Sequence, residues 1–316
     1  MRSKIGGTVM LASALAVGGY MGRPRAKVKA GRSDLCFDAR WRYGCTMEPR
    51  TPFQQLFERA LSGGGRGLAT GAGALVRRGL DFMLPPVCSQ CRIPVAEPHS
   101  LCATCWAGLR LIERPYCERL GIPFGYDLGP GALSAEAIAD PPPFDKARAA
   151  VLYEGMAAEL VHRLKYQDRT ELGRLIGRLT ARAGTDLFPR AGLIVPVPLH
   201  PSRLLTRKFN QSQLIAAELG RQCGLPVDPL ALARIKATDR QVGLNPRERA
   251  ENVAGAFRVP PAAKARVAGM HILLVDDVLT TGATVKAATR ALKRGGAAGV
   301  DVITFARVAA AGTLHI

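Results

Sequence analysis

Apolar runs and amphipathic stretches alternate along the second half of the chain. Four short apolar runs predict buried strands at positions 149–153, 193–199, 272–275 and 300–305. Apolar residues at helical spacing predict helices at 156–166 and 210–223, and another from Thr284 to the glycine pair at 295–296. Continuous apolar strands are typical of a parallel sheet covered on both faces. We therefore expect an α/β domain over residues 146–310, with helices flanking a parallel sheet.

The first 145 residues lack this alternation. Residues 1–50 are basic and unpatterned, which indicates either a disordered extension or a start assigned too early, with Met47 as the true start. Helical spacing at 51–84, interrupted by a glycine run, predicts a helical lead-in. Residues 85–120 are turn-rich around paired cysteines, and residues 121–145 run through Gly, Pro and Ala without a period, which predicts a linker. No obvious internal repeat is visible.

The N-terminus imitates a secretory signal, because Arg2 and Lys4 precede an apolar stretch at positions 5–20. That stretch is too short and too rich in glycine for a good transmembrane helix, so we expect no stable membrane span. The eight cysteines include two pairs with C-x-x-C spacing, which favours metal binding in a reducing compartment over a disulfide framework. We expect a cytoplasmic protein, and a functional signal remains the alternative.

Composition adds one constraint on the partner. Apolar residues make up 47% and charged residues 22% of the 316 positions, as in an ordinary globular protein. The formal net charge of +19 favours anionic partners, namely nucleotides, phosphosugars or nucleic acid. Single-strand binding surfaces commonly combine basic grooves with stacking aromatics, but aromatics are only 6% of this chain and do not interleave with its basic runs.

The paired cysteines predict a structural zinc site. Cys88 and Cys91 form one pair, and Cys102 and Cys105 form a second pair further along a turn-rich segment. Four thiolates at this spacing can close a tetrahedral Zn²⁺ site with no ligand position left open. The metal supplies folding free energy that such a small module lacks. Four buried free cysteines are the alternative reading, and Cys117 stands outside the set.

A phosphate cradle with two carboxylates beside it is predicted after the third strand. Asp276 and Asp277 follow the strand at the sheet edge where open α/β folds bind ligands. A loop of small residues comes next. Its glycine can adopt a backbone conformation that other residues rarely adopt, so that successive N–H groups can point at one anion. The helix that follows adds the positive end of its dipole. The loop residues are Thr280, Thr281, Gly282, Ala283 and Thr284.

The two carboxylates favour a phosphorylated sugar over a bare phosphate. Neither the lysine of a Walker loop nor the glycine spacing of a Rossmann fingerprint is present. Ribose hydroxyls can donate to carboxylates while a phosphate lies in the loop, and Mg²⁺ can bridge the remaining oxygens. The stretch from His271 to Thr284 closely resembles the phosphoribosyl-pyrophosphate (PRPP) signature of type I phosphoribosyltransferases. An ordinary strand-to-helix turn is the alternative.

Cationic side chains follow two other elements. Lys165 lies near the end of the 156–166 helix, and His200, Arg203, Arg207 and Lys208 follow the 193–199 strand. Guanidinium and ammonium groups at a strand's carboxyl end suit a pyrophosphate leaving group. We treat Lys165, Arg203, Arg207 and Lys208 as candidate pyrophosphate ligands, and solvated basic surface is the competing interpretation.

Taken in order, the motifs resemble the ComF family. They are the cysteine knuckles, V-P-V-P-L-H, R-K-F-N-Q-S, L-N-P-R-E-R-A-E-N-V and V-D-D-V-L-T-T-G-A-T, within residues 80–308. In that family a second C-x-x-C often includes the position of Cys117, but residue 120 here is Leu, which argues against a second zinc site. The resemblance implies a Cys₄ zinc ribbon followed by a type I phosphoribosyltransferase-like domain. It also implies PRPP-type binding with Mg²⁺ and a link to DNA uptake in natural transformation.

Two classes of function stay open. The first is a phosphoribosyltransferase, in which Asp276 and Asp277 position a Mg²⁺–PRPP substrate and the protein stabilises departing charge. No residue is identified as a general base, so the catalytic residues are unknown. The second is a non-catalytic factor for processing or regulation that uses the same fold and binds single-stranded DNA or the DNA-uptake machinery. The intact acidic pair favours the first class.

Overall fold

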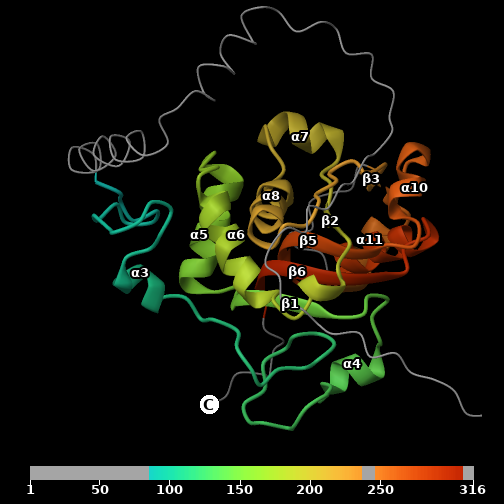
Figure 1. Cartoon of the computed structure of the whole chain (residues 1–316), viewed down its shortest axis with the longest axis horizontal. Coiled ribbons are helices and arrows are strands. Elements are labelled where there is room, and N and C mark those ends of the chain that lie inside the picture. Colours follow the sequence, from blue (N-terminus) through green and yellow to red (C-terminus); the bar gives the residue numbers. More distant parts are fainter. Residues whose placement is uncertain (1–84, 237–245, 309–316) are drawn as a thin grey trace, which may run out of the picture. The chain divides into compact units, whose positions relative to one another are not determined.

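The computed structural model describes residues 85–236 and 246–308 of the chain (Figure 1). The expected extension over residues 1–50 and the expected helical lead-in over residues 51–84 lie outside the described residues. Within the described residues, no helix is both long enough and apolar enough to cross a membrane.

The core is a parallel sheet of four strands, β1 (Ala147–Leu152), β2 (Leu193–Pro196), β5 (His271–Leu279) and β6 (Gly299–Arg307). Their order across the sheet is β1-β6-β5-β2, and every neighbouring pair is parallel. The predicted α/β architecture is confirmed. The strand expected at 272–275 runs further, so that Asp276 and Asp277 belong to its last part, and the strand expected at 193–199 ends earlier, at Pro196.

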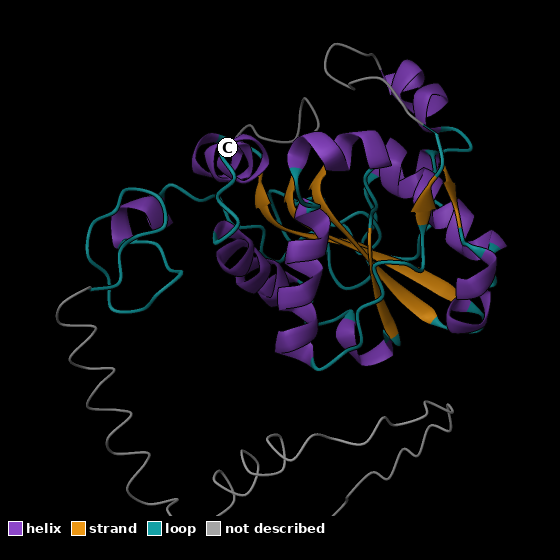
Figure 2. Cartoon of the chain, turned by 90° about the horizontal axis from the view of Figure 1, so that it is seen from above, coloured by secondary structure: helices purple, strands orange, loops and turns teal. Residues whose placement is uncertain are grey.

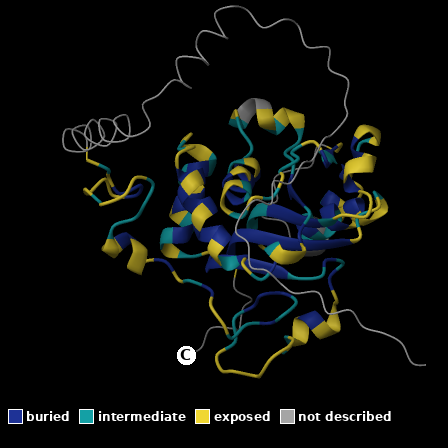
Figure 3. Ribbon diagram, viewed as in Figure 1, coloured by how far each residue is buried: buried dark blue, intermediate teal, exposed yellow. Residues whose placement is uncertain are grey.

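Helices cover both faces of this sheet (Figures 2 and 3). Ile272 and Leu274 of β5 pack in the core beneath α11 (Ala283–Arg294), while Leu273 and Val275 pack on the opposite face. That opposite face is covered by α5 (Gly155–Tyr166), α6 (Leu172–Ala183) and α8 (Gln211–Cys223). Alternate side chains of one strand therefore enter two cores, which is why its sequence reads as an unbroken apolar run.

Helix α6 was not predicted from the sequence, and its glycines explain why. Gly173 and Gly177 lower the expected helix propensity of the segment. In the structure they let α6 approach α8, because an added Cβ would lie 2.9 Å from Leu214 Cβ at the first position and 2.5 Å from Glu218 Cβ at the second. The glycines serve close helix packing, and tertiary contact outweighs local propensity here.

A connecting segment extends hydrogen bonding along the outer side of β1. Leu111 forms an antiparallel bridge with Val151. The Ile112 N–H donates to the Ala150 carbonyl at 2.9 Å, and the Leu152 N–H donates to the Arg110 carbonyl at 2.9 Å. Strand β1 is therefore paired on both sides, with β6 on one and this segment on the other.

The remaining elements are short. A second sheet pairs β3 (Ala233–Arg234) with β4 (Phe257–Arg258) in antiparallel fashion. The other helical elements are α3 (Ala103–Ala107), α4 (Ala135–Ala139), η1 (Phe188–Arg190), α7 (Pro201–Arg207), α9 (Pro246–Val253), η2 (Pro261–Ala263) and α10 (Lys264–Val267).

Candidate functional site

The acidic pair lies beyond the end of a neighbouring strand. Strand β2 pairs with β5 up to Pro196 opposite Val275, and one further hydrogen bond joins the Val197 N–H to the Val275 carbonyl at 2.8 Å. Proline has no N–H to continue the ladder. Asp276 and Asp277 are consequently paired only on the β6 side, and their side chains face an opening at the carboxyl edge of the sheet.

The loop after β5 turns on a single glycine. Gly282 has φ 75°, in the left-handed region, and is the N-cap of the twelve-residue helix α11. The helix begins at Ala283, so its amino terminus, with the positive end of the helix dipole, follows the loop directly. Thr281 Oγ1 is buried and, among the described residues, has no hydrogen-bond partner.

These elements enclose a pocket of about 580 Å³, within the size range of small-molecule sites. Every predicted phosphosugar or pyrophosphate ligand except Thr281 lies on its wall; these are Lys165, Arg203, Arg207, Lys208, Asp276, Asp277, Thr280, Gly282, Ala283 and Thr284. The structure thus brings together residues that are far apart in sequence. Their ligand remains a prediction.

An internal ion pair holds the centre of the pocket. Lys165 Nζ lies 2.9 Å from Asp277 Oδ2. Asp276 Oδ1 accepts hydrogen bonds from the Ser212 hydroxyl at 3.0 Å and from the Asp277 N–H at 2.9 Å. These contacts fix the two carboxylates next to each other and place one ammonium group against them.

Burial and like charge set the proton affinity of this pair. Burial, followed by the charge of Asp277, raises the pKa of Asp276 to about 7. Burial alone would lower the pKa of Lys165, but the attraction of Asp277 and Asp276 outweighs it and the pKa is raised. Lys165 is therefore charged at neutral pH, whereas the Asp276 carboxyl is poised between its two states.

The other predicted cations are held by partners on the pocket rim. Lys208 Nζ lies 2.7 Å from Asp168 Oδ2, and both side chains are mainly exposed. The Arg207 guanidinium lies 5.3 Å from the ring centre of Tyr166. His200 caps α7 through its ring nitrogen and does not line the pocket.

Further wall residues were not singled out by sequence reasoning. They are Tyr153, Tyr166, Asp168, Gln211, Ser212 and Arg234, besides apolar neighbours. Ser212 does belong to the R-K-F-N-Q-S motif, which was a usable signal. Arg234 is 8% exposed, and burial together with the charge of Arg203 lowers its pKa. No local pattern distinguished Arg234 from a surface arginine.

The four cysteines predicted to bind zinc converge. The sulfurs of Cys88, Cys91, Cys102 and Cys105 all lie within 4.8 Å of one another. Tetrahedral coordination at about 2.3 Å per bond needs sulfurs roughly 3.8 Å apart, so the donor set and its spacing fit Zn²⁺. Burial raises the pKa of Cys88, but backbone N–H groups directed at its sulfur outweigh burial and lower it to about 6, which favours the thiolate that a metal needs.

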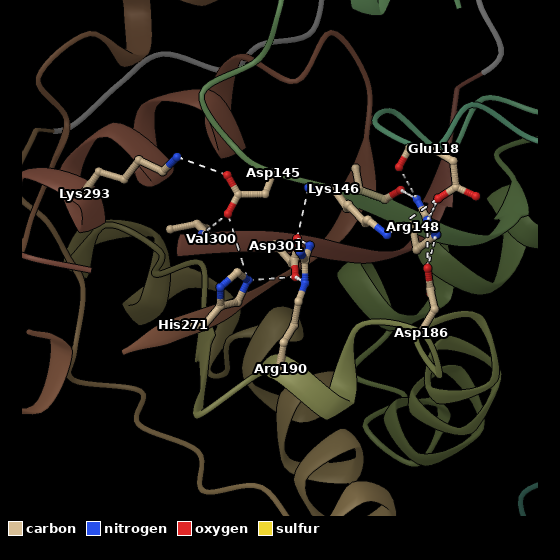
Figure 4. A network of polar contacts seen from close by, with 11 residues as sticks. Glu118, Asp145, Lys146, Arg148, Asp186, Arg190, His271, Lys293, Val300 and Asp301 are labelled. Carbon is tan, nitrogen blue, oxygen red and sulfur yellow. Dashed lines mark hydrogen bonds and ion pairs between the residues drawn. The ribbon is translucent and has the colours of Figure 1, made fainter. Parts of the chain in front are cut away.

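A second group of potential ligands lies at the opposite, amino edge of the sheet (Figure 4). His271 Nε2 is 2.8 Å from Asp301 Oδ2 and 4.0 Å from Asp145 Oδ2. Asp301 is fully buried, and Arg190 donates to both of its oxygens. Since Asp301 also accepts the Lys146 N–H at 3.0 Å, these groups satisfy one another, and we interpret the cluster as structural.

Two family models match the chain. Residues 79–138 match a double zinc ribbon domain, and residues 214–315 match a phosphoribosyl transferase domain.

Curated relatives match over most of the described region. The chain is 34% identical to "DNA utilization protein YhgH" of Salmonella typhi, over 71% of this chain and 98% of the relative. It is 28% identical to "Competence protein F" of Haemophilus influenzae, over 70% and 96%. It is 29% identical to "Competence protein ComFC" of Bacillus subtilis, over 51% and 63%.

Proposed function

The chain belongs to the ComF/YhgH family, and we propose that its phosphoribosyltransferase domain binds a phosphorylated ribose, with Mg²⁺–PRPP as the candidate ligand. The observation that carries the proposal is the acidic pair beside the glycine-capped helix terminus, inside a pocket ringed by cations. An ordinary strand-to-helix turn has no reason to combine these three features.

Each part of the pocket suits one part of such a ligand. The helix terminus and the hydroxyls of Thr280 and Thr284 can donate to a 5′-phosphate. Asp276 and Asp277 can accept from ribose hydroxyls and offer the oxygen ligands that Mg²⁺ prefers. The ammonium of Lys165 already lies against Asp277, which supports a preference of this carboxylate for a cation. Bound Mg²⁺ would neutralise charge between carboxylate and phosphate oxygens.

Five cationic side chains line the same pocket as the loop. Arg203, Arg207 and Arg234 line the pocket together with Lys165 and Lys208. Several positive groups on the wall of one pocket match a pyrophosphate, both as a bound group and as a departing one. The rim therefore favours PRPP over a simple sugar phosphate.

The family connects this pocket to DNA. We propose that the protein acts in the uptake or use of external DNA, and this is supported by its similarity to a DNA utilization protein and a competence protein. The acceptor substrate, if the domain transfers the ribosyl group, is not indicated by any residue of the pocket. Binding of a phosphosugar as a regulator without transfer is the alternative.

Calorimetry with Mg²⁺–PRPP on the zinc-loaded full chain tests the proposal. We expect saturable binding that is lost in an Asp276→Asn/Asp277→Asn variant. The matched control is Glu97→Gln/Asp127→Asn, which also removes two negative charges but at exposed positions. In this control the amide oxygen introduced by Asp127→Asn can still accept the hydrogen bond that the Gly129 N–H donates to the natural carboxylate.

Two outcomes would contradict the proposal. One is the absence of binding to the intact protein, and the other is equal loss in the site variant and in the charge-matched control. In either case single-stranded DNA becomes the next ligand to titrate, over a series of salt concentrations that reports phosphate contacts.

A further inference from the structure

Residues 116–139 repeat the backbone of residues 87–107. Each segment starts with an antiparallel bridge, Val87 to Pro94 in the first and Tyr116 to Pro123 in the second. In each segment a cysteine follows the first bridge residue, and its N–H donates a hydrogen bond across the turn. The Cys88 N–H donates to the Ile93 carbonyl at 2.7 Å, and the Cys117 N–H donates to the Ile122 carbonyl at 2.8 Å. We call these segments the first lobe (87–107) and the second lobe (116–139).

The turns of the two lobes also match in conformation. Arg92 has φ 67° and Gly121 has φ 64°, and both follow a first cysteine by four residues. The N–H of Arg92 donates to the Cys88 carbonyl at 3.0 Å, and that of Gly121 to the Cys117 carbonyl at 2.8 Å. A left-handed residue at this place is rare outside glycine, so its presence in both lobes indicates one shared turn.

The return segments match as well. In the first lobe the Ser89 N–H donates to the Ser100 carbonyl at 3.0 Å, and in the second the Glu118 N–H donates to the Ala132 carbonyl at 2.9 Å. One further N–H then points at the first cysteine of each lobe: Cys102 N to Cys88 Sγ at 3.3 Å, and Ser134 N to Cys117 Sγ at 3.2 Å.

A short helix follows directly in both lobes, α3 after Cys102 and α4 after Ser134. The two lobes are therefore copies of one fold, although the sequence showed no obvious repeat.

This correspondence identifies what replaced each metal ligand. The four cysteines of the first lobe correspond, in order, to Cys117, Leu120, Ser134 and Ala137. A structural zinc needs four deprotonated or neutral donors in tetrahedral arrangement, and leucine and alanine offer none. The second lobe therefore does not fit the zinc that the double zinc ribbon model implies for it.

Apolar packing fills the place of the metal. Cys117 is fully buried, Leu120 is 7% exposed and Ala137 is 1% exposed. These residues belong to the same core as Phe144 and Ala147, the first residue of strand β1. The second lobe places these three side chains in this large core, whereas the first lobe contributes Leu101 to the edge of the other core and is otherwise linked to the domain by hydrogen bonds from Arg163 and Arg169 to its backbone.

Close backbone contact joins the second lobe to β1. A Cβ at Gly121 would lie 2.5 Å from the Ala147 carbonyl oxygen, and the Ala147 N–H donates to the Arg119 carbonyl at 2.8 Å. Only glycine permits this approach.

A buried arginine adds polar contacts between β1 and the second lobe (Figure 4). Arg148 of β1 is 2% exposed and donates to the Glu118 carbonyl and carboxylate, each at 2.9 Å, and to Asp186 at 2.7 Å. Its guanidinium also lies 4.6 Å from the ring centre of Tyr116. Since Glu118 follows Cys117 directly, this contact holds the turn that a metal would otherwise hold.

We infer that the second lobe is a zinc ribbon that folds without zinc, and that the chain's ribbon region binds a single zinc ion, in the first lobe. The sheet takes over the stabilising role of the missing metal. Removal of zinc should therefore unfold the first lobe and leave the second lobe and the sheet intact.

Metal analysis of the purified full chain tests this inference. We expect one zinc per chain in the natural sequence and in Cys117→Ser, and loss of that zinc in Cys88→Ser. A second zinc that disappears in Cys117→Ser would overturn the inference. Cys36→Ser/Cys45→Ser serves as the control for thiols outside both lobes.

Restoring the ligands gives a second, positive test. Leu120→Cys/Ser134→Cys/Ala137→Cys, with the natural Cys117, provides four thiols at the corresponding positions. We expect this variant to bind one additional zinc; a folded variant that still binds one would show that the second lobe lacks ribbon geometry and would overturn the inference. Hydrogen exchange after chelation reports independently, since loss of protection in 116–139 together with 87–107 contradicts a metal-free lobe. If the triple variant does not fold, the hydrogen-exchange experiment and the zinc content of Cys117→Ser still test the inference.

Discussion

Lys165 Nζ and Asp277 Oδ2 lie 2.9 Å apart, so the pocket contains its own counter-ion before any ligand arrives. The ammonium group comes from the end of α5, and the carboxylate from the end of β5. If the proposed ligand brings Mg²⁺ to Asp277, Lys165 would be free to turn toward the ligand's negative groups. On the proposed function, ligand binding would then replace this ion pair by a contact of Asp277 with Mg²⁺ and a contact of Lys165 with the ligand.

Lys165→Met should weaken PRPP binding by about tenfold or more, because a hydrogen bond to a charged group contributes roughly 1.5–3 kcal/mol. If Lys165 contacts the pyrophosphate, the loss should be clearly larger for PRPP than for ribose 5-phosphate in parallel calorimetric titrations. Lys293→Met, at the far end of α11, is the matched control and should leave both affinities unchanged. Equal losses for the two ligands would argue against a pyrophosphate contact.

Asp276→Asn should stabilise the protein increasingly as pH rises. Burial and the charge of Asp277 raise the folded-state pKa of Asp276 from 3.8 to about 7, so the folded state binds this proton more tightly than the unfolded state. At low pH Asp276 is protonated in both the folded and the unfolded state and has no effect of this kind. As the pH rises above the unfolded-state pKa of Asp276, the free energy of unfolding of the natural protein falls, and this fall continues to about pH 7 and then levels off.

The free energy of unfolding of Asp276→Asn should therefore rise relative to that of the natural protein by about 1–2 kcal/mol between pH 5 and pH 8. This is less than the full pKa shift would give, because the pocket is open to solvent. Urea unfolding at several pH values measures it. An advantage that is constant over this range would contradict the assigned burial of Asp276.

Gly282→Ala and Gly129→Ala should cost similar stability but differ in ligand binding. Both glycines have positive φ, 75° and 83°, and in each case a Cβ meets no atom closer than 3.7 Å. The cost at each position is then backbone strain, about 1–2 kcal/mol. Only Gly282 lies in the proposed phosphate loop, so only its variant should bind PRPP about tenfold more weakly. Comparable binding by both variants would remove the loop from the site.

Arg148→Met should destabilise the protein by about 2–3 kcal/mol, because the partly buried Asp186 carboxylate loses its guanidinium partner, while Glu118 keeps Arg114 and Lys146. Arg182→Met is the control, since its pair with Glu113 is exposed on both sides and should contribute about 1 kcal/mol or less. Denaturant unfolding compares the two variants. A small effect at Arg148 would weaken the argument that this residue holds the second lobe.

The sheet and the acidic loop could be predicted because their signals are local. A strand with two buried faces leaves an unbroken apolar run, and the β5–α11 motif places both acids and the glycine within a few residues. The pocket wall was harder, because Ser212 meets Asp276 across 64 positions of sequence and Arg234 comes from a two-residue strand. Contacts of that kind depend on the fold and leave no periodic pattern.

The second lobe shows a different limit of sequence patterns. Cysteine spacing finds a ribbon only where the cysteines remain, and this lobe keeps one of the four. The residual likeness is spread over short matches of ordinary composition: Pro86 and Cys88 against Pro115 and Cys117, Ile93-Pro94 against Ile122-Pro123, and Leu101 and Ala103 against Leu133 and Ala135. What the lobe retains is a set of backbone hydrogen bonds, which side-chain patterns do not report.

The segment beside β1 has a practical consequence for shortened versions of this protein. Without residues 110–112, the outer edge of an entirely buried strand would present free N–H and carbonyl groups, which is the usual starting point for strand-to-strand aggregation. A fragment that begins at Lys146, where the α/β domain starts in sequence, should be prone to self-association. One that begins before Arg110 should remain monodisperse.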